Sequence, residues 1–417
     1  MKQPRILLSA YQCGPGMGSV SQIGWEWYSR LAGRVPLTLV THSRNRECLT
    51  AAGAPLRGSE VIYIDTEWFA GPLYRLASRM FPKSQHAVFL ISSADFFVYD
   101  GAALKQLRKR SGEWDIVHAV TPVSPVSATR MHRLGPPLIL GPWNGGLKTP
   151  AAFAGIMRDD SAWMYRIRDI GRMLDRIFGS TMHARLVLTA TKATDESLPP
   201  HTRTLRMLEN GVDLSIFHSR VWRAPDELLP LHVIFVGRLI PVKGIPMLLE
   251  AVSRLRTEIT MRVTIVGDGP IRADLEQATK DKHLANIVHF TGSKPLPEIA
   301  ALLTTAHVFC LPSVRESGGA VLLESMAAGV PVLGVNYGGP AEIIDDEVGR
   351  KLSAAGEEPL ILDLMEAFRD IIRNPAQWKI RGENGRRRAE QQYGWDARIN
   401  TGIELYNKTL AETGTYA

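Results

Sequence analysis

The chain has 417 residues, 45% hydrophobic and 22% charged, which is the composition of a soluble globular protein large enough for two domains. Its net charge of +7 is uneven, because residues through Arg206 carry 26 lysines and arginines against 15 aspartates and glutamates, whereas the remainder carries 23 against 27. The three cysteines are not clustered, which argues against a disulfide framework. The first apolar run is too short for a signal peptide, and no apolar run approaches the ~18 residues of a membrane span. We therefore expect a cytoplasmic protein.

Short runs rich in Val, Ile and Leu alternate with helix-length amphipathic segments along the whole chain. Continuous apolar runs are typical of strands buried on both faces of a parallel sheet. The alternation predicts an α/β protein built of doubly wound layers. The expected strands are residues 5–9, 37–41, 61–65, 116–120, 138–141 and 187–191 in the first half, and 233–237, 263–267, 288–291, 308–311 and 332–335 in the second.

The first strand leads into a glycine-rich loop that contains Gly14, Gly16 and Gly18. Glycine between a strand and a helix lets the backbone approach a phosphate group, although a flexible turn is the structural alternative. The loop is not a complete dinucleotide fingerprint, and no acidic residue ends the next strand near Thr41. A nicotinamide-dependent oxidoreductase is therefore disfavoured.

Two later first-half strands end in residues of chemical interest. His118 lies in the strand at 116–120, where a satisfied core histidine is the alternative to a ligand contact. The turn after the strand at 138–141 contains Trp143, Asn144 and Gly145.

Residues 74–81 and 163–178 mix aromatic and basic side chains. Such helices can lie on an anionic membrane surface, and the basic first half favours this. Packing against the protein's own sheet is an equally good interpretation. No nucleic-acid recognition motif accompanies the positive charge, so we expect no nucleic-acid partner.

Asn210-Gly211 is a turn signal after the last strand of the first half. We place an N-terminal domain at residues 1–208 and a C-terminal domain at residues 209–394. Two doubly wound domains are expected to face each other across a cleft, with ligands at the carboxyl ends of the strands.

The loop after the strand at 308–311 carries Glu316, and the helix after it carries Glu324. Ser317, Gly318 and Gly319 precede that helix, whose first amides, at Ala320 and Val321, suit a diphosphate. Either glutamate alone is more easily explained as a solvated side chain.

Cations follow another second-half strand. Gly237 and Arg238 end the strand at 233–237, and Lys243 precedes the next helix. Arg and Lys at a strand end close to a helix N-terminus suit a pyrophosphate. Asp268 follows the next strand, where capping a helix is the expected structural role, and Ser293 and Lys294 follow a fourth.

Together these motifs resemble glycosyltransferase family 4 over nearly the whole chain. The resemblance rests on their order and spacing: Gly237-Arg238, Lys243-Gly244, Gly267-Asp268-Gly269, Glu316 with Glu324, and Gly338-Gly339. It implies a GT-B fold and transfer of a hexosyl unit with retention of anomeric configuration. It also implies a last helix, residues 395–412, that crosses back to the first domain.

The resemblance also implies residue roles. Arg238 and Lys243 hold the donor diphosphate, Glu316 the donor sugar, Glu324 the ribose, and His118 the transferred sugar. Further donor contacts fall on Gly16, Gly18, Gly237, Asp268, Ser293, Lys294, Ser317, Gly318, Gly319, Ala320 and Val321, and acceptor-side positions on Gly14, Trp143, Asn144 and Gly145. Ser317 departs from the glycine that is usual there, which leaves the donor sugar least predictable.

The expected partners are a nucleotide-sugar donor, with UDP favoured by family frequency, and a saccharide or lipid-linked acceptor. No Asp-x-Asp pair stands at a strand end, so we expect no metal and no cofactor. The alternative function is an inactive nucleotide-sugar-binding protein of the same fold.

Overall fold

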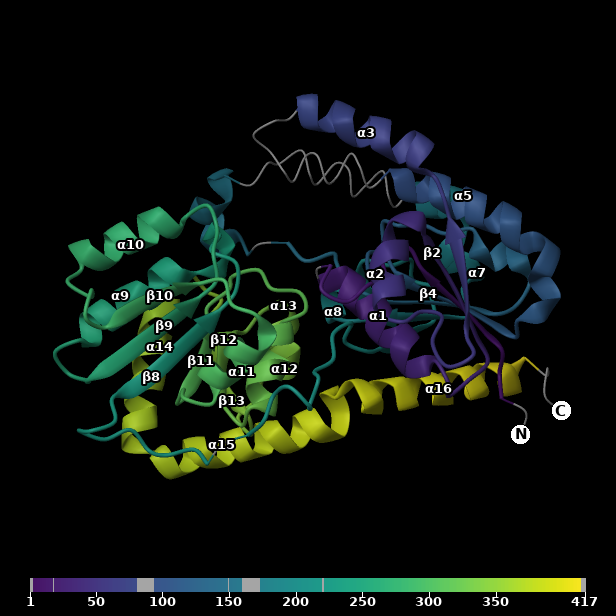
Figure 1. Ribbon diagram of the computed structural model, residues 1–417. Coiled ribbons are helices and arrows are strands. Elements are labelled where there is room, and N and C mark those ends of the chain that lie inside the picture. The colour runs from purple at the N-terminus through teal and green to yellow at the C-terminus, as the bar shows by residue number, and fades with distance from the viewer. Residues whose placement is uncertain are drawn as a thin grey trace. The chain divides into compact units, whose positions relative to one another are not determined.

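The computed structural model describes residues 3–17, 19–80, 94–148, 150–159, 173–219 and 221–413. The chain divides into two compact units, and Figure 1 shows the elements of each. Unit 1 contains Met1–Gly146, Ala162–Glu209 and Ile399–Ala417, and unit 2 contains Leu147–Ser161 and Asn210–Arg398. Leu147–Ser161 therefore groups with unit 2, although the sequence had placed this segment in the N-terminal domain.

Unit 1 is built on a parallel seven-stranded sheet with the order β3-β2-β1-β4-β5-β6-β7. Its strands are β1 (Ile6–Ala10), β2 (Leu37–His42), β3 (Glu60–Ile64), β4 (Ile116–Thr121), β5 (Leu138–Trp143), β6 (Leu186–Thr189) and β7 (Thr204–Arg206). Its helices include α1 (Ser19–Leu31), α2 (Arg46–Ala51), α3 (Glu67–Met80), α5 (Asp95–Leu107), α7 (Ser180–His183) and α8 (Lys192–Glu196).

Unit 2 is built on a parallel six-stranded sheet with the order β10-β9-β8-β11-β12-β13. Its strands are β8 (Leu231–Val236), β9 (Met261–Val266), β10 (Val288–Gly292), β11 (Val308–Leu311), β12 (Val332–Val335) and β13 (Gly349–Leu352). Its helices include α9 (Ile245–Leu255), α10 (Arg272–Asp281), α11 (Leu296–Leu303), α12 (Ala320–Ala327), α13 (Gly338–Ile343), α14 (Glu357–Arg373) and α15 (Pro375–Arg388).

The expected strands all form, with ends within two residues of those observed, and all pair in parallel. The prediction of two doubly wound α/β domains is therefore confirmed. The sequence missed β7 and β13, which are edge strands. Thr204–Arg206 is only three residues long, and Gly349–Leu352 contains Arg350 and Lys351, so neither shows the apolar run of a central strand.

The chain leaves unit 1 after Glu209 and returns to it along α16 (Trp395–Glu412). The two crossings are hydrogen-bonded to each other: the Val212 amide donates to the Tyr393 carbonyl at 2.9 Å, and the Trp395 amide donates to the Val212 carbonyl at 3.2 Å. A Cβ on Gly211 would lie 2.7 Å from the Trp395 ring, so the glycine permits this contact. Among the described helices, none combines the length and the hydropathy that a bilayer crossing needs.

Candidate functional site

The sheet of unit 2 reverses its winding direction between β8 and β11. Successive strands after β8 are added on one side as far as β10, and those from β11 onward on the other. The loops after β8 and β11 therefore leave the sheet at its topological switch point, which is where doubly wound sheets commonly bind ligands. Arg238 and Lys243 lie on the first loop, and Glu316 lies on the second.

Lys243 and Glu316, separated by 73 residues in the sequence, form an ion pair across this point. Lys243 lies at the end of a short 3-10 turn (Pro241–Lys243), and its side chain is 18% exposed; that of Glu316 is 16% exposed. An incoming phosphate would compete with Glu316 for the Lys243 ammonium. The pair holds a cation in a shielded place, where its charge acts more strongly than in water.

The N-terminus of α12 lies beside the same carboxylate. Glu316 Oε1 accepts a long hydrogen bond, 3.4 Å, from the amide of Gly319, the residue before the helix. Gly319 has a left-handed φ of 62° and no side chain to cap the helix. The amides of Ala320 and Val321 begin a helix and so lack partners in a preceding turn. This end of α12 attracts negative charge.

Glycines let the strand-end loops touch backbone to backbone. Gly244 has a φ of 70°, and a Cβ there would lie 2.0 Å from the Pro312 carbonyl oxygen, which joins the loops after β8 and β11. A Cβ on Gly267 would lie 1.9 Å from the Gly237 oxygen, which joins the loops after β9 and β8. No side chain larger than hydrogen fits at either glycine.

Glycine also allows the loop after β12 to contact the loop after β11. A Cβ on Gly338 would lie 2.2 Å from the Glu316 carbonyl oxygen, and the Gly339 amide donates to that oxygen at 2.9 Å. The backbone of Glu316 is thus fixed from the neighbouring strand, while its side chain is fixed by Lys243. These contacts position the carboxylate before any ligand arrives.

Arg238 and Glu324 complete the donor residues predicted on these two loops. Arg238 is exposed, and no described residue forms an ion pair with it. Glu324, in α12, keeps some exposed surface, yet burial raises the pKa of its carboxyl to about 7. No described side chain donates a hydrogen bond to that carboxyl. A partner that donates hydrogen bonds would satisfy it.

The other predicted donor residues follow β9 and β10, further along the same edge. Asp268 is exposed, accepts the Gly269 amide at 2.7 Å and pairs with Arg272 at 3.0 Å. The residue that precedes α10 in the cap position is Ile271, so the prediction that Asp268 caps this helix is wrong. Ser293 is exposed, and Lys294 pairs with Glu298 at 2.8 Å.

In unit 1, His118 has no exposed surface and both ring nitrogens are hydrogen-bonded. Nε2 faces the Gly141 carbonyl at 2.7 Å and must donate to it, so Nδ1 accepts from the Tyr406 hydroxyl, also at 2.7 Å. Burial lowers the pKa of His118 to about 4. His118 is therefore a satisfied core histidine that links β4 to α16, and its ring has no free nitrogen for a contact with a sugar.

The turn after β5 also differs from an exposed acceptor surface. Trp143 is buried in the core cluster of unit 1. Asn144 donates to the Glu209 carboxylate, and the Gly145 amide donates to the Thr194 hydroxyl at 3.0 Å. The buried Trp143 therefore serves packing and is not an exposed acceptor contact, whereas the partly exposed Asn144 and Gly145 stay predicted acceptor-side positions.

In the first loop, Gly14 is buried, whereas Gly16 is exposed with a φ of 73°. The Gly16 amide donates to the Gln22 side chain at 3.2 Å. Gly18 lies outside the described residues.

Sequence reasoning missed one contribution to the donor edge. Lys148, in the segment that groups with unit 2, accepts a hydrogen bond from the Tyr337 hydroxyl at 2.6 Å, and Leu147 lies against Gly338. No local pattern marks this contact, since it joins residues 189 positions apart.

Comparison with known proteins finds similarity in the second half of the chain. Residues 227–388 match the sequence model of the family Glycosyl transferases group 1. The chain is 28% identical over 220 residues to MMP alpha-(1->4)-mannosyltransferase from Mycolicibacterium hassiacum, covering 52% of this chain and 51% of the relative. It is 29% identical over 245 residues to D-inositol 3-phosphate glycosyltransferase from Paenarthrobacter aurescens, covering 55% and 58%. The matched part spans about half the length of these relatives.

Solved structures match the whole fold. Sucrose-phosphate synthase from Thermosynechococcus elongatus has a TM-score of 0.65 at 18% identity, covering 98% of this chain and 100% of that one. HepE from Anabaena, crystallised with UDP and glucose, has a TM-score of 0.60 at 16% identity, covering 99% and 100%. The prediction of a GT-B fold is confirmed.

The contact at Gly244 yields a stability prediction. Gly244→Ala and Gly292→Ala both place a Cβ at nearly the same left-handed φ, 70° and 73°, which costs each variant about 1 kcal/mol. Only Gly244→Ala meets a backbone oxygen, whereas at Gly292 the nearest atom is the end of the Arg272 side chain at 3.4 Å. We expect Gly244→Ala to lose at least about 2 kcal/mol more in urea denaturation. Equal losses would show that the loops after β8 and β11 do not touch in this way.

Proposed function

We propose that this chain, whose residues 227–388 form a glycosyl transferases group 1 domain, transfers a hexosyl unit from a nucleotide diphosphate sugar to a saccharide hydroxyl. One observation carries the proposal: Lys243, Glu316 and the N-terminus of α12 meet where the winding of the sheet reverses. A cation beside unsatisfied helix amides is a seat for a diphosphate. UDP is the proposed nucleotide, supported by its presence in the HepE structure.

The proposed reaction breaks the bond between the sugar's anomeric carbon and the donor phosphate oxygen, and forms one to the acceptor oxygen. Lys243, Arg238 and the first amides of α12 stabilise the charge that grows on the leaving diphosphate. The leaving phosphate takes the acceptor's proton, so attack occurs on the same face and configuration is retained. Glu316 orients the donor sugar and Glu324 binds the ribose. Retention and independence from metal ions rest on the family resemblance.

Two loop variants test the proposed chemistry through release of UDP from a panel of UDP-sugars with saccharide acceptors. Removing a preorganised charge that stabilises the leaving group costs about 10²–10³ in kcat, so Arg238→Ala should lose about that much and Glu316→Ala at least about tenfold. Arg254→Ala, an exposed arginine of unit 2 that pairs with Glu358, is the control. Activity is expected to survive EDTA.

Unchanged turnover in both Arg238→Ala and Glu316→Ala would contradict the assignment. Binding of UDP without turnover of any donor would instead support the alternative of an inactive nucleotide-sugar-binding protein.

The buried carboxyl of Glu324 predicts a pH dependence. Its pKa is about 7 in the free protein, and ribose hydroxyls that donate hydrogen bonds favour the ionised form, so binding should lower the pKa. The complex then holds fewer protons, and affinity for UDP rises as pH increases toward about 7 and levels off above it. Calorimetry in buffers of different ionisation enthalpy, near pH 7, should show about half a proton more released by the wild type than by Glu324→Gln.

Subtracting the proton release of Glu324→Gln from that of the wild type removes the contribution of protons that UDP itself gains or loses. Identical proton release by both would remove Glu324 from the nucleotide site.

We further propose that unit 1 docks on an anionic membrane surface, as a lipid-linked acceptor would require. The support is α3, where Trp68, Tyr74 and Leu76 are exposed beside the exposed Arg75 and Arg79. Apolar side chains next to cations bind anionic interfaces. Residues 163–172 of the second aromatic and basic stretch lie outside the described residues.

Sedimentation with phospholipid vesicles tests this docking. The wild type should sediment with vesicles that contain phosphatidylglycerol and less with pure phosphatidylcholine. Leu76→Ser should weaken sedimentation several-fold, whereas Leu228→Ser, an equally apolar exposed site in unit 2, should not. Equal loss in both variants, or none in either, would exclude α3 as the contact.

A further inference from the structure

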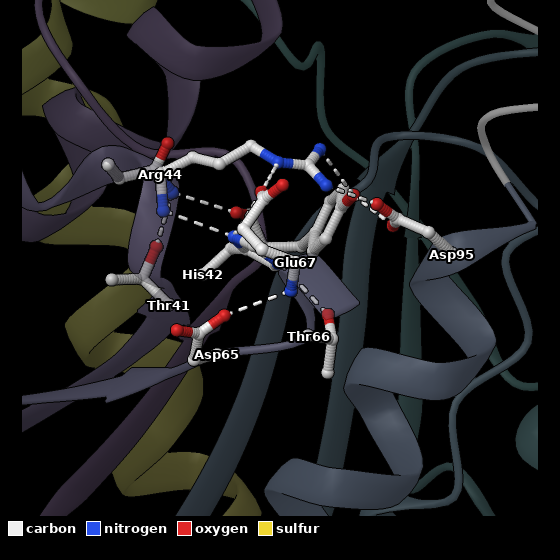
Figure 2. A network of polar contacts seen from close by, with 9 residues as sticks. Thr41, His42, Arg44, Asp65, Thr66, Glu67 and Asp95 are labelled. Atoms are coloured by element: carbon white, nitrogen blue, oxygen red, sulfur yellow. Dashed lines mark hydrogen bonds and ion pairs between the residues drawn. The ribbon is translucent and has the colours of Figure 1, made fainter. Parts of the chain in front are cut away.

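Side chains from four segments meet at the carboxyl edge of the unit 1 sheet, in the network drawn in Figure 2. Tyr11 follows β1, Arg44 follows β2, Glu67 begins α3 after β3, and Asp95 begins α5. Packing in the core of unit 1 does not account for the charges of Arg44 and Glu67, because both side chains are partly exposed to solvent. The edge is the one at which parallel sheets bind ligands.

The inner layer of the network is a buried support. Asp95 has almost no exposed surface, and its carboxylate accepts the Tyr11 hydroxyl and an Arg44 Nη2 hydrogen bond of 2.5 Å. Burial raises the pKa of Tyr11, so this hydroxyl remains a donor. The Tyr11 hydroxyl holds the Asp95 carboxylate, and that carboxylate in turn holds the Arg44 guanidinium in place.

The outer layer is exposed. Arg44 and Glu67 have side chains that are 43% and 46% exposed, and Arg44 Nε donates to Glu67 Oε1. A guanidinium has five N–H donors. Three of them point to Glu67, Asp95 and, at 3.4 Å, the Tyr11 hydroxyl. No described residue pairs with the other two donors of Arg44 or with Glu67 Oε2, and these groups are offered to a ligand.

The sign of the local charge limits what that ligand is. The positive charge of Arg44 is paired with two negative charges, those of Glu67 and Asp95. The exposed Asp65, two residues before Glu67, adds a third negative charge and accepts a hydrogen bond from the Glu67 amide at 2.9 Å. His42 packs beside them with Nε2 at 2.9 Å from the Thr66 hydroxyl; burial lowers the pKa of His42, which keeps it neutral. The network is negative overall, although unit 1 is rich in basic residues.

The exposed part of this network offers adjacent donors and an acceptor, which suit a pair of neighbouring hydroxyls, and its carboxylates disfavour a phosphate or carboxylate at Arg44 itself. We infer that Arg44 and Glu67 bind adjacent hydroxyls of a neutral acceptor saccharide, with Asp95 and Tyr11 as positioning residues. This inference rests on the proposed transferase function and narrows its acceptor to an uncharged sugar at this subsite.

The chain provides a matched control. Arg110 and Glu60 form another exposed ion pair of unit 1, with side chains 33% and 46% exposed. Glu60 is the first residue of β3, whereas Glu67 follows the end of that strand, so the control pair lies at the amino edge of the sheet. Glu60→Gln and Glu67→Gln therefore remove the same charge from equally exposed arginine pairs at opposite edges.

The test measures acceptor and donor KM separately, with UDP-sugar as donor and a panel of neutral methyl hexosides, their 6-phosphates and glucosamine as acceptors. Saturation-transfer NMR of the same glycosides with the UDP-bound protein gives a readout that needs no turnover. Loss of a charge-assisted hydrogen bond should raise the acceptor KM about tenfold in Glu67→Gln and leave the donor KM within about twofold. Glu60→Gln should change neither.

Preference for a phosphorylated hexoside, or an acceptor KM and saturation transfer that are unchanged in Glu67→Gln, would overturn the inference. Absence of saturation transfer to every neutral hexoside would overturn it as well. Failure of the proposed function itself is recognised separately, by the absence of UDP binding and of UDP release in the wild type.

Discussion

The proposed donor site at the carboxyl edge of the unit 2 sheet depends on backbone contact between the loops that follow neighbouring strands. In unit 2 a Cβ at Gly244, Gly267 or Gly338 would overlap a carbonyl oxygen of an adjacent loop, at 2.0, 1.9 and 2.2 Å. Each glycine therefore allows one pair of neighbouring loops to come into contact at the carboxyl edge of the sheet. Because the backbones of these loops are in contact, Lys243 and Glu316 are held close together although they are 73 residues apart in the sequence. A preorganised arrangement of charges costs little reorganisation when a ligand arrives.

The charges of the two units follow different designs. In unit 2 the proposed diphosphate site combines a largely buried ion pair, an arginine that no described residue pairs with and the first amides of α12, and the raised pKa of Glu324, about 7, leaves its carboxyl only partly ionised near neutral pH. In unit 1 the network around Arg44 carries more negative than positive charge. This difference agrees with the proposed anionic leaving group and with the uncharged acceptor that we infer. The two sites are thus complementary in chemistry even when each unit is considered by itself.

The sequence predicted what depends on local pattern. Apolar runs located the central strands. The sequence also predicted that Lys243 and Glu316, which follow two of these strands, lie close together, because parallel strands bring their carboxyl ends together. Tertiary context decided the rest. His118 looked like a ligand contact, but Tyr406, 288 residues away, satisfies its ring. Trp143 ends a strand yet lies in the core. The network around Arg44 joins residues as far apart as Tyr11 and Asp95, and no spacing in the sequence reveals it.

The central claim is that one diphosphate binds where the winding of the unit 2 sheet reverses. A crystal structure of the chain with UDP tests this most directly. We expect phosphate oxygens within hydrogen-bond distance of Arg238, Lys243 and the amides of Ala320 and Val321, with the ribose at Glu324. We also expect Glu316 to give up at least part of its contact with Lys243. UDP bound elsewhere, with the Lys243–Glu316 pair intact and the start of α12 unoccupied, would contradict the claim.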